Sequence, residues 1–350
     1  MSYQGFAITD TSKWSDAKKI EFKPRTLGGK DVEVKVDHCG ICGSDIHTVT
    51  GGWGGTVVPV IPGHEIIGTV TKVGPEVTLH KVGDRVGVGA QIDSCFNCDR
   101  CANGHENYCE HSLSTYNDEK DGEISYGGYA NFVTANEHFV FNVPEKLDSA
   151  EYAPLFCAGL TVYAPLRNNI KAGDHVGIVG IGGLGHLAIQ FAKALGATVY
   201  ALSRGEKKKQ DALKLGADYY IDTTVENWSK PYKFKLDFVL SCANSSKGFT
   251  NDYFEILKVF GKLNSVGLPE EPIPISALSF LGNGVSFGAT HLGNREEMLE
   301  MLDVVVKHDV KPWCDLLPIS EENVKKGLER TERGDVKYRI TLTNFAEGFK

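Results

Sequence analysis

Four cysteines lie within fifteen residues of this chain, in the segment CFNCDRCANGHENYC. They are Cys95, Cys98, Cys101 and Cys109. Disulfide bonds, metal ligands and chance are the competing explanations. A structural zinc ion needs four nitrogen or sulfur ligands in a closed tetrahedron, and four thiolates complete that shell even with His105 and His111 nearby. We therefore expect a structural zinc ion here, whose binding free energy would stabilise the fold of the loop.

The composition favours metal ligands over disulfide bonds. The segment MSYQGFAITDTSKWSD has no apolar run, and no apolar stretch of about 18 residues occurs elsewhere, so we expect neither a secretory signal nor a membrane span. We expect a cytoplasmic protein, in which thiols usually stay reduced. The nine cysteines are also an odd number, which fits a complete set of disulfide bonds poorly.

Length and charge narrow the class of protein further. A chain of 350 residues, of which 41% are hydrophobic, can bury a sizeable core and is expected to form about two domains. The net charge of −8 argues against a nucleic-acid partner, which needs a basic surface that neutralises phosphates. We expect neither nucleic acid nor a membrane as a partner.

A second set of possible metal ligands is dispersed over three segments, CGICGSDIH, PGHEIIG and APLFCAGLTVY. Their side chains of interest are Cys42, Asp45, His47, His64, Glu65 and Cys157. Each alone is ordinary, because buried cysteines and partnered histidines are common in protein cores. Together they can supply two thiolates and one imidazole and leave a fourth position open, which is the pattern of a catalytic zinc site.

The first 145 residues read as rich in β structure. Short apolar segments punctuated by glycine, at 32–41, 68–74 and 83–89, predict strands of a compact barrel-like or sandwich-like domain. The charged segment YNDEKDGE at 116–123 is interpreted as a solvated loop.

From about residue 150 the pattern changes to alternating strands and helices. HVGIVG and TVYALS predict buried strands, and GLGHLAIQFAKALG between them predicts a helix. Such alternation predicts a parallel, doubly wound sheet, and hence the α/β class. The expected strands are 175–180, 198–203, 218–222, 236–243, 261–267, 284–289 and 336–343, and the expected helices are 183–196, 206–216 and 294–309.

A glycine motif between the first of these strands and its helix indicates a dinucleotide. Gly180, Gly182 and Gly185 have the G-x-G-x-x-G spacing. The first allows a tight turn, the second leaves room for a pyrophosphate, and the third lets helix and strand pack closely. The helix N-terminus then offers N–H groups to the phosphates, so we also assign Gly183 and Leu184 to cofactor binding. The alternative is a glycine-rich turn in another α/β protein.

The end of the second strand favours NADP over NAD. An NAD site places an acidic residue there to bind the ribose 2′-OH, whereas this chain has ALSRGEKKK. Ser203, Arg204 and Lys208 can donate hydrogen bonds and positive charge to a 2′-phosphate. Glu206 lies three residues past the strand end, where a helix is expected to begin. The alternative is that the lysines belong to a solvated helix face.

The order of these motifs carries a family resemblance. GHE, the four-cysteine loop, Cys157 and GIGGLG occur in the order typical of the zinc-dependent medium-chain alcohol dehydrogenases, which this chain resembles over essentially its whole length. APLFCAGLTVYAPL resembles the cinnamyl alcohol dehydrogenase branch, including its fungal NADP-dependent members. The resemblance implies a GroES-like β-rich catalytic domain from 1–148 and 289–350, a Rossmann domain at 149–288, and a homodimer that pairs Rossmann edge strands.

The resemblance also implies roles for the dispersed ligands. Cys42, His64 and Cys157 would bind the catalytic zinc, which makes two zinc ions per chain with the structural one. Glu65 would lie beside it and enter its ligand shell when water or product leaves, and Asp45 would orient the histidine ligand.

The implied reaction is reversible hydride transfer between NADPH and aromatic, cinnamaldehyde-like or medium-chain aldehydes. Zinc would act as a Lewis acid on the aldehyde oxygen. The resemblance routes the proton from Ser44 through the cofactor ribose to His47, and we assign Thr161 to cofactor binding. Ser44 could equally cap a helix, and both roles are compatible.

The substrate pocket of this small-molecule enzyme is expected to be apolar. Trp53, Phe96, Leu113, Phe280 and His291 are its candidates, although each could be an ordinary core residue. The chain departs from the family at Thr290 and His291, where we expect a small Gly-Ser pair near the cofactor.

Two other activities compete with this prediction. A polyol dehydrogenase of the same superfamily usually has an acid in place of Cys157 and often prefers NAD, so Cys157 and Arg204 argue against it. A catalytically silent NADPH-binding protein of this fold commonly lacks the zinc ligands that this chain retains.

Overall fold

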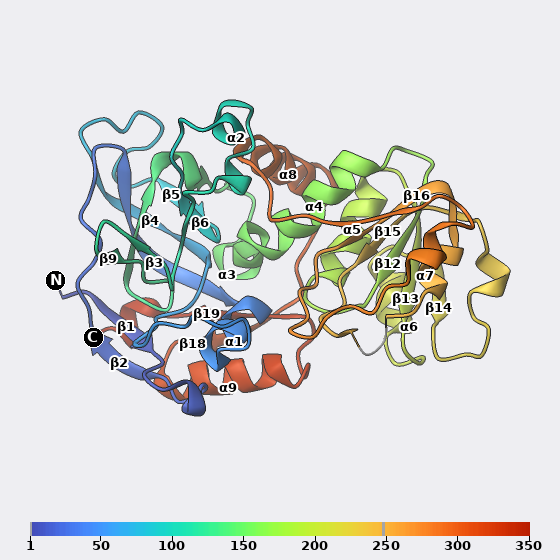
Figure 1. Ribbon diagram of the computed structural model, residues 1–350. Coiled ribbons are helices and arrows are strands. Elements are labelled where there is room, and N and C mark those ends of the chain that lie inside the picture. The colour runs from blue at the N-terminus through green and yellow to red at the C-terminus, as the bar shows by residue number, and fades with distance from the viewer. Residues whose placement is uncertain (1, 247–248) are drawn as a thin grey trace. The chain divides into compact units, whose positions relative to one another are not determined.

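The computed structural model describes residues 2–246 and 249–350. It divides into two compact units (Figure 1). Unit 1 comprises Met1–Cys157, Asn294–Leu302 and Pro312–Lys350, and unit 2 comprises Ala158–Gly293 and Asp303–Lys311. Each unit therefore combines separate parts of the chain, and helix α8 (Arg295–His308) contributes to both.

Unit 1 is built around a seven-stranded sheet in which the end of the chain joins its beginning. The strand order is β11-β5-β4-β3-β19-β18, and β10 also pairs with β3. Both β4 and β19 run antiparallel to β3. The strands are β3 (Asp31–Ile41), β4 (Glu65–Val73), β5 (Arg85–Val88), β10 (Phe132–Asn136), β11 (Val140–Asn142), β18 (Cys314–Pro318) and β19 (Arg339–Thr343).

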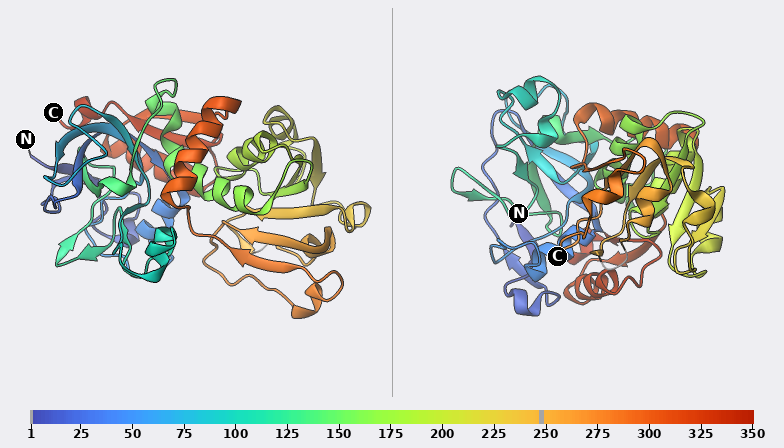
Figure 2. Two further views of the ribbon diagram at one scale, coloured as in Figure 1. Left: turned by 90° about the horizontal axis from the view of Figure 1, so that it is seen from above. Right: turned by 45° about the vertical axis from the view of Figure 1, so that its right-hand side comes forward.

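The core of unit 1 draws on both ends of the chain. Val34 and Val36 of β3 pack in one hydrophobic cluster with Ile340 and Leu342 of β19. Figure 2 shows from two further sides how the red C-terminal segment returns to the blue N-terminal part. The strands expected at 32–41, 68–74, 83–89 and 336–343 are confirmed as β3, β4, β5 and β19.

Short elements decorate this sheet and carry several of the candidate site residues. They are β1 (Gln4–Ala7), β2 (Lys18–Glu21), α1 (Gly43–Thr50), β6 (Gln91–Asp93), α2 (Asp99–Ala102), β7 (Leu113–Ser114), β8 (Glu119–Lys120), β9 (Glu123–Ile124), α3 (Ser149–Tyr152), α9 (Glu321–Glu332) and α10 (Phe345–Gly348).

The segment 116–123 differs from its interpretation as a solvated loop. It contains the strand β8 and the start of β9, which pair antiparallel as a small hairpin. Its first residue, Tyr116, is only 7% exposed. The Tyr116 ring packs against the core of unit 1, and its hydroxyl donates to the buried Asp45 carboxylate. The charged residues that follow it along the chain gave no indication of this burial.

Unit 2 contains a parallel six-stranded sheet with the order β14-β13-β12-β15-β16-β17. This order reverses direction at β12 and confirms the predicted doubly wound Rossmann arrangement. Helices α4 and α5 pack against its central strands. The elements are β12 (His175–Val179), β13 (Thr198–Ser203), β14 (Tyr219–Asp222), β15 (Leu236–Ser241), β16 (Leu257–Ser265), β17 (Ser286–Ala289), α4 (Ala158–Asn169), α5 (Gly185–Ala194), α6 (Lys209–Lys214) and α7 (Asp252–Glu255).

One helix of unit 2 is shorter than expected. The helix expected at 206–216 begins only at Lys209, and residues 204–208 form turns after β13. Gly205 there has φ of +69°, a left-handed conformation that favours glycine and is incompatible with a helix. The turn therefore separates Ser203 and Arg204, at the strand end, from the helix α6.

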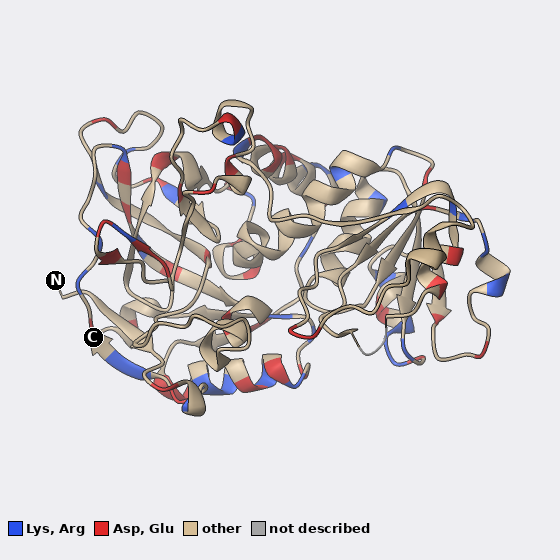
Figure 3. Ribbon diagram, in the orientation of Figure 1, with Lys and Arg blue, Asp and Glu red and all other residues tan. Residues whose placement is uncertain are grey.

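Charged residues of both signs are interspersed along both units (Figure 3). Helix α9, for example, alternates acidic and basic residues. Over the described ranges 2–246 and 249–350, no helix is both long enough and apolar enough to cross a membrane.

Candidate functional site

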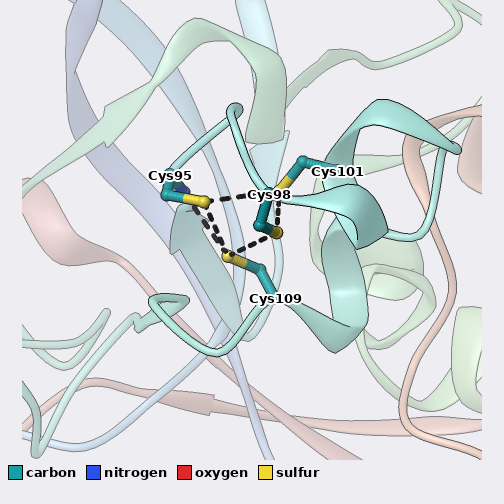
Figure 4. A group of neighbouring side chains, drawn as sticks. All are labelled: Cys95, Cys98, Cys101 and Cys109. Carbon is teal, nitrogen blue, oxygen red and sulfur yellow. Dashed lines mark hydrogen bonds between the residues drawn. The ribbon is translucent and has the colours of Figure 1, made fainter.

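The four cysteines of the loop 95–109 converge on one point in unit 1 (Figure 4). The distances between their Sγ atoms are 3.4 Å for Cys95 and Cys109, 3.5 Å for Cys98 and Cys101, 3.9 Å for Cys98 and Cys109, and 4.0 Å for Cys95 and Cys101. Four sulfur atoms bound to a tetrahedral zinc ion lie about 3.8 Å apart, whereas a disulfide bond is only about 2.05 Å long. The geometry of this set therefore fits zinc.

Backbone N–H groups support thiolate charge in this loop. The N–H groups of His111 and Cys95 point to Cys109 Sγ, at 3.3 and 3.5 Å. A hydrogen bond from the Asn97 backbone lowers the pKa of the Cys95 thiol to about 6. Burial, with the neighbouring thiols, raises the pKa of Cys101 to about 12. Because thiolates rather than thiols bind metal, the contacts of Cys95 and Cys109 favour a metal ion, and Cys101 would have to lose its proton on binding it.

A buried carboxylate anchors the same loop to the rest of unit 1. Glu106 Oε1 lies 2.9 Å from His138 Nε2 and accepts a 2.8 Å hydrogen bond from the Arg295 N–H. Burial alone would raise the pKa of Glu106, but these two partners lower it to about 2. Glu106 is therefore ionised over the whole neutral range, and it ties the cysteine loop to the start of α8.

The dispersed ligands form a second cluster, which also lies in unit 1 and is fully buried. Each of Cys42, His64, Glu65 and Cys157 offers one ligand atom, and these atoms all lie within 4.8 Å of one another. Cys42 immediately precedes α1, His64 immediately precedes the strand β4, Glu65 begins that strand, and Cys157 follows a short 3-10 turn. The fold thus brings together three segments that are far apart in the sequence.

Two buried atoms of this cluster lack a hydrogen-bond partner. His64 Nε2 and Glu65 Oε2 are both buried without any partner. Such orphaned polar atoms are costly and rare in folded proteins, so each needs an explanation. A cation held by two thiolates and one imidazole, with a carboxylate beside it, would satisfy both atoms, and this donor set is the one that zinc prefers.

Asp45 lies at the centre of a hydrogen-bond network behind His64. It accepts hydrogen bonds from the hydroxyls of Tyr116 and Tyr129, at 2.7 and 3.0 Å, and from the Cys42 N–H at 2.9 Å. Its Oδ1 lies 3.6 Å from His64 Nδ1, which is an ion-pair distance rather than a hydrogen bond. The Tyr116 ring also stacks on the His64 ring, with centroids 5.5 Å apart.

The electrostatics of the network favour a particular orientation of His64. Burial alone would lower the pKa of His64, but the neighbouring Asp45 carboxylate and Cys42 raise it to about 9. The negative charge of Asp45 favours a proton on Nδ1, the nitrogen that faces it, and Nε2 is the nitrogen that would bind a metal ion in place of its own proton.

Arg339 of β19 pairs with Glu65 inside the same buried region. Its guanidinium nitrogen Nη2 lies 2.5 Å from Glu65 Oε1, and the side chains of both residues are at most 5% exposed. Burial raises the pKa of Glu65 to about 7, although the Arg339 charge opposes that shift. This partner comes from the C-terminal strand and was not predicted. A lone charged residue in the strand RITLT was the signal that could have indicated it.

The proposed proton-transfer residues lie on the short helix α1. Ser44 and His47 are three residues apart and therefore lie on one face of this helix. Ser44 Oγ lies 3.7 Å from Cys42 Sγ, at the edge of the buried cluster. The indole of Trp53 stacks on the His47 ring, with centroids 4.6 Å apart, and Trp53 is 43% exposed.

The other pocket candidates have separate surroundings. Phe96 of unit 1 contacts the rings of His138 and Phe139, and Leu113 lies in the hydrophobic core of unit 1. Phe280 of unit 2 packs edge-to-face on a neighbouring phenylalanine ring. His291 is an exposed residue of unit 2.

The glycine turn of unit 2 has the conformation that its motif requires. Gly180 has φ of +86°, and a Cβ atom on Gly185 would collide with the carbonyl oxygen of Gly180. A Cβ atom on Gly182 would meet open space, as expected where a ligand approaches the backbone. Gly183 and Leu184 complete the turn before α5 begins.

Lys208 links this turn to the end of β13. Its Nζ donates a 2.5 Å hydrogen bond to the carbonyl of Ile181 within the glycine turn. Burial lowers the pKa of Lys208, with the nearby charges of Lys207 and Arg204 as further causes. Ser203 ends β13 and Arg204 is exposed beside it, whereas Thr161 lies on α4. The three residues predicted to bind a 2′-phosphate, Ser203, Arg204 and Lys208, thus lie within the segment 203–208.

Comparisons with known proteins agree with this architecture. Models of the alcohol dehydrogenase GroES-like domain and of the zinc-binding dehydrogenases match residues 28–145 and 183–307. NADP-dependent alcohol dehydrogenase 6 of Saccharomyces cerevisiae is 42% identical over 355 residues, which cover 99% of this chain and 98% of that protein. A cinnamyl alcohol dehydrogenase of Sorghum bicolor has a TM-score of 0.92 at 35% identity, with 98% of each chain covered. CAD from Helicobacter pylori, complexed with NADP(H), has a TM-score of 0.88 at 33% identity, again with 98% of each chain covered.

The chain therefore belongs to the zinc-dependent medium-chain alcohol dehydrogenases, in the cinnamyl alcohol dehydrogenase branch. It is an enzyme with a GroES-like domain and a Rossmann sheet, as the resemblance of its motifs implied.

Proposed function

We propose that this enzyme transfers a hydride reversibly between NADPH and an aromatic or medium-chain aldehyde. The observation that carries the proposal is the buried cluster of Cys42, His64, Glu65 and Cys157, in which two polar atoms lack partners. When bound, zinc supplies a Lewis acid for the carbonyl oxygen and NADPH supplies the hydride. Cys42, His64 and Cys157 would hold the catalytic zinc, and Glu65 would lie beside it.

The second group of ligands supports a structural role. Cys95, Cys98, Cys101 and Cys109 would hold a closed zinc site, because all four positions of the tetrahedron are filled by thiolates. A closed site leaves no position for a substrate, so hydride transfer belongs to the buried cluster. The proposal therefore requires two zinc ions per chain.

The segment after β13 supports NADPH as the cofactor. Ser203, Arg204 and Lys208 offer a hydroxyl, a guanidinium and an ammonium group, and none of the three is an acid. Two relatives support the same cofactor: the Saccharomyces cerevisiae alcohol dehydrogenase is NADP-dependent, and the Helicobacter pylori CAD was solved in complex with NADP(H). We propose that residues 158–293 bind the dinucleotide through this segment and through the glycine turn.

Proton delivery is proposed to follow one face of α1. Ser44 would donate a proton to the alkoxide formed from the aldehyde, and His47 would return a proton from solvent, since imidazole titrates near neutrality. The stacked Trp53 would restrict the His47 ring and line the apolar side of the pocket, where an aromatic aldehyde is bound by burial of its ring. Thr290 and His291 would then influence the range of substrates.

A Ser44→Ala variant tests the proposed relay. We expect kcat to fall about a hundredfold, the contribution typical of a general acid, while the zinc content stays at two ions per chain. The matched control is Thr50→Ala, which removes a hydroxyl at the end of the same helix that donates to the carbonyls of Ile46 and His47 and accepts from the Gly52 N–H. Unchanged turnover in Ser44→Ala would remove Ser44 from the relay.

We propose a homodimer that pairs the edge strand β17, because Phe260, Leu278 and Leu281 of unit 2 are each at least 76% exposed. Sedimentation velocity would contradict this with a single monomeric species. We also propose the cytoplasm as the compartment, where the nine free thiols would stay reduced.

The decisive experiment compares the oxidation of NADPH and NADH by zinc-replete enzyme, with cinnamaldehyde as the substrate. We expect good turnover and a strong preference for NADPH. A preference for NADH would contradict the assignment of the segment after β13. No turnover with either cofactor, in protein that contains two zinc ions, would point to a different substrate or to a silent NADPH-binding protein.

A further inference from the structure

The segment that follows β13 is held in place by side chains from the end of β14. The Gly205 N–H donates a 2.8 Å hydrogen bond to Asp222 Oδ1, and the Gly205 carbonyl accepts one of 2.5 Å from the Tyr220 hydroxyl. Asp222 Oδ1 also accepts from the N–H and the hydroxyl of Thr224, at 2.9 and 2.7 Å. The Thr223 N–H donates to the Ser203 carbonyl at 3.0 Å.

These bonds fix the backbone on both sides of Arg204. Ser203 is directly opposite Asp222 in the parallel pairing of β13 and β14, so both strands end at the same level. Gly205 adopts a left-handed φ with open space around it, and nothing in its own packing would hold that conformation. Its N–H and its carbonyl are instead both bonded to β14, and the Ser203 carbonyl is bonded to Thr223.

We propose that Asp222 and Tyr220 are positioning residues for the cofactor 2′-phosphate, which they serve by holding Ser203 and Arg204 in their binding geometry. The inference rests on the proposed NADP preference and deepens it. Neither residue is assigned a contact with the phosphate, and both act through Ser203 and Arg204. A hydrogen-bonding group fixed in advance loses less entropy on binding, so a held segment binds the phosphate more tightly than a mobile one.

Asp222 is expected to act through the hydrogen bonds that it accepts and not through its negative charge. A carboxylate near a phosphate is repulsive, so electrostatics alone would favour a neutral residue at this position. An asparagine could accept the same bonds from Gly205 and Thr224 without the charge, whereas an alanine would accept none. Asp222→Asn and Asp222→Ala therefore separate the positioning role from the effect of charge.

The test compares two ligands that differ only in the 2′-phosphate. Dissociation constants of adenosine 2′,5′-bisphosphate and of adenosine 5′-monophosphate are measured by calorimetry with the full-length, zinc-replete protein. The ratio of the two constants reports the 2′-phosphate subsite, and general damage to the fold cancels. We expect the preference for the bisphosphate to fall about tenfold in Asp222→Ala and about threefold in Tyr220→Phe, and to stay within about twofold in Asp222→Asn.

Asp218→Ala is the matched control, from the opposite end of the same strand. Asp218 precedes β14, accepts a 2.8 Å hydrogen bond from the Val199 N–H and pairs with Lys193, so its loss weakens the same pair of strands. We expect an unchanged preference in this variant.

Three results would overturn the positioning role: an unchanged or larger preference in Asp222→Ala, a fall in Asp222→Asn as large as in Asp222→Ala, or an equal fall in Asp218→Ala. A wild-type protein that binds both ligands equally would instead overturn the NADP assignment itself, and the positioning role with it.

Discussion

The two candidate zinc sites are opposites in how the fold builds them. The loop site takes four thiolates from fifteen consecutive residues, and three of these cysteines are partly exposed. The buried site takes its ligands from three distant segments, and every ligand is buried. The sulfur atoms of the loop site are contacted by backbone N–H groups of the loop itself, whereas the buried site is surrounded by the side chains of Asp45, Tyr116 and Arg339.

This difference separates stability from catalysis. A loop without a core of its own needs the metal in order to fold, so its zinc contributes stability. A buried cluster already lies in a packed core, where the surrounding dipoles and charges are held before any substrate binds. We therefore expect damage to the loop to lower the free energy of unfolding and damage to the buried cluster to lower the rate.

The largest expected effect is the loss of a ligand of the buried cluster. In Cys157→Ala, kcat/KM should fall at least about a thousandfold, because the metal-supplied stabilisation of the alkoxide is worth several kcal/mol. Zinc analysis should show one ion lost per chain. Cys314→Ala is the matched control, since Cys314 is also a free cysteine of unit 1 and its Sγ contacts the Glu151 carbonyl. Activity retained in Cys157→Ala would contradict the assignment of this cluster.

A loop cysteine should show the reverse pattern. Cys98→Ser should lower the free energy of unfolding by about 4 kcal/mol or more, because loss of a metal is among the few mechanisms that reach this size. The rate per folded molecule should stay within about tenfold of the wild type. Calorimetry and active-site titration would measure both quantities. A Cys98→Ser variant that unfolds like the wild type but has lost its activity would contradict a structural role for the loop site.

Arg339→Met would test whether the buried Glu65 carboxylate depends on the Arg339 guanidinium for its stability. It leaves the Glu65 carboxylate buried without its guanidinium, which typically costs about 3–5 kcal/mol. The double variant Arg339→Met with Glu65→Gln should recover most of that loss, since no charge is then left unpaired. Urea unfolding of the two single variants and the double variant measures the coupling. Additive losses would show that the pair does not interact energetically.

The smallest expected effect is the pH dependence contributed by Glu106. Its pKa is about 2 in the folded protein against an ordinary value of 4.5, so its stabilising contribution is fully present above pH 4.5 and is lost as the pH falls towards 2. Glu106→Gln should therefore flatten the fall in unfolding free energy below pH 4.5. The exposed Glu119→Gln is the control and should keep the wild-type slope. Equal slopes in all three proteins would contradict an anchoring role for Glu106.

Much of the fold followed from local patterns. The strand 198–203 has the bounds that its apolar run predicted, and the glycine turn before α5 has the conformation that its spacing requires. The helix expected at 206–216 begins only at Lys209, because residues 204–208 form bends and turns that the lysine-rich pattern does not reveal.

The sequence by itself determined the candidate ligands of the loop site, because four cysteines within fifteen residues can meet without help from the rest of the chain. It also determined the candidate ligands of the buried site, through the order of its motifs. Only the tertiary structure decided what surrounds them. Tyr116, Tyr129 and Arg339 reach Asp45 and Glu65 across 71, 84 and 274 residues, and such long-range partners leave no periodicity or spacing in the sequence. Burial then decides their strength, since a hydrogen bond or charge removed from water acts at low dielectric.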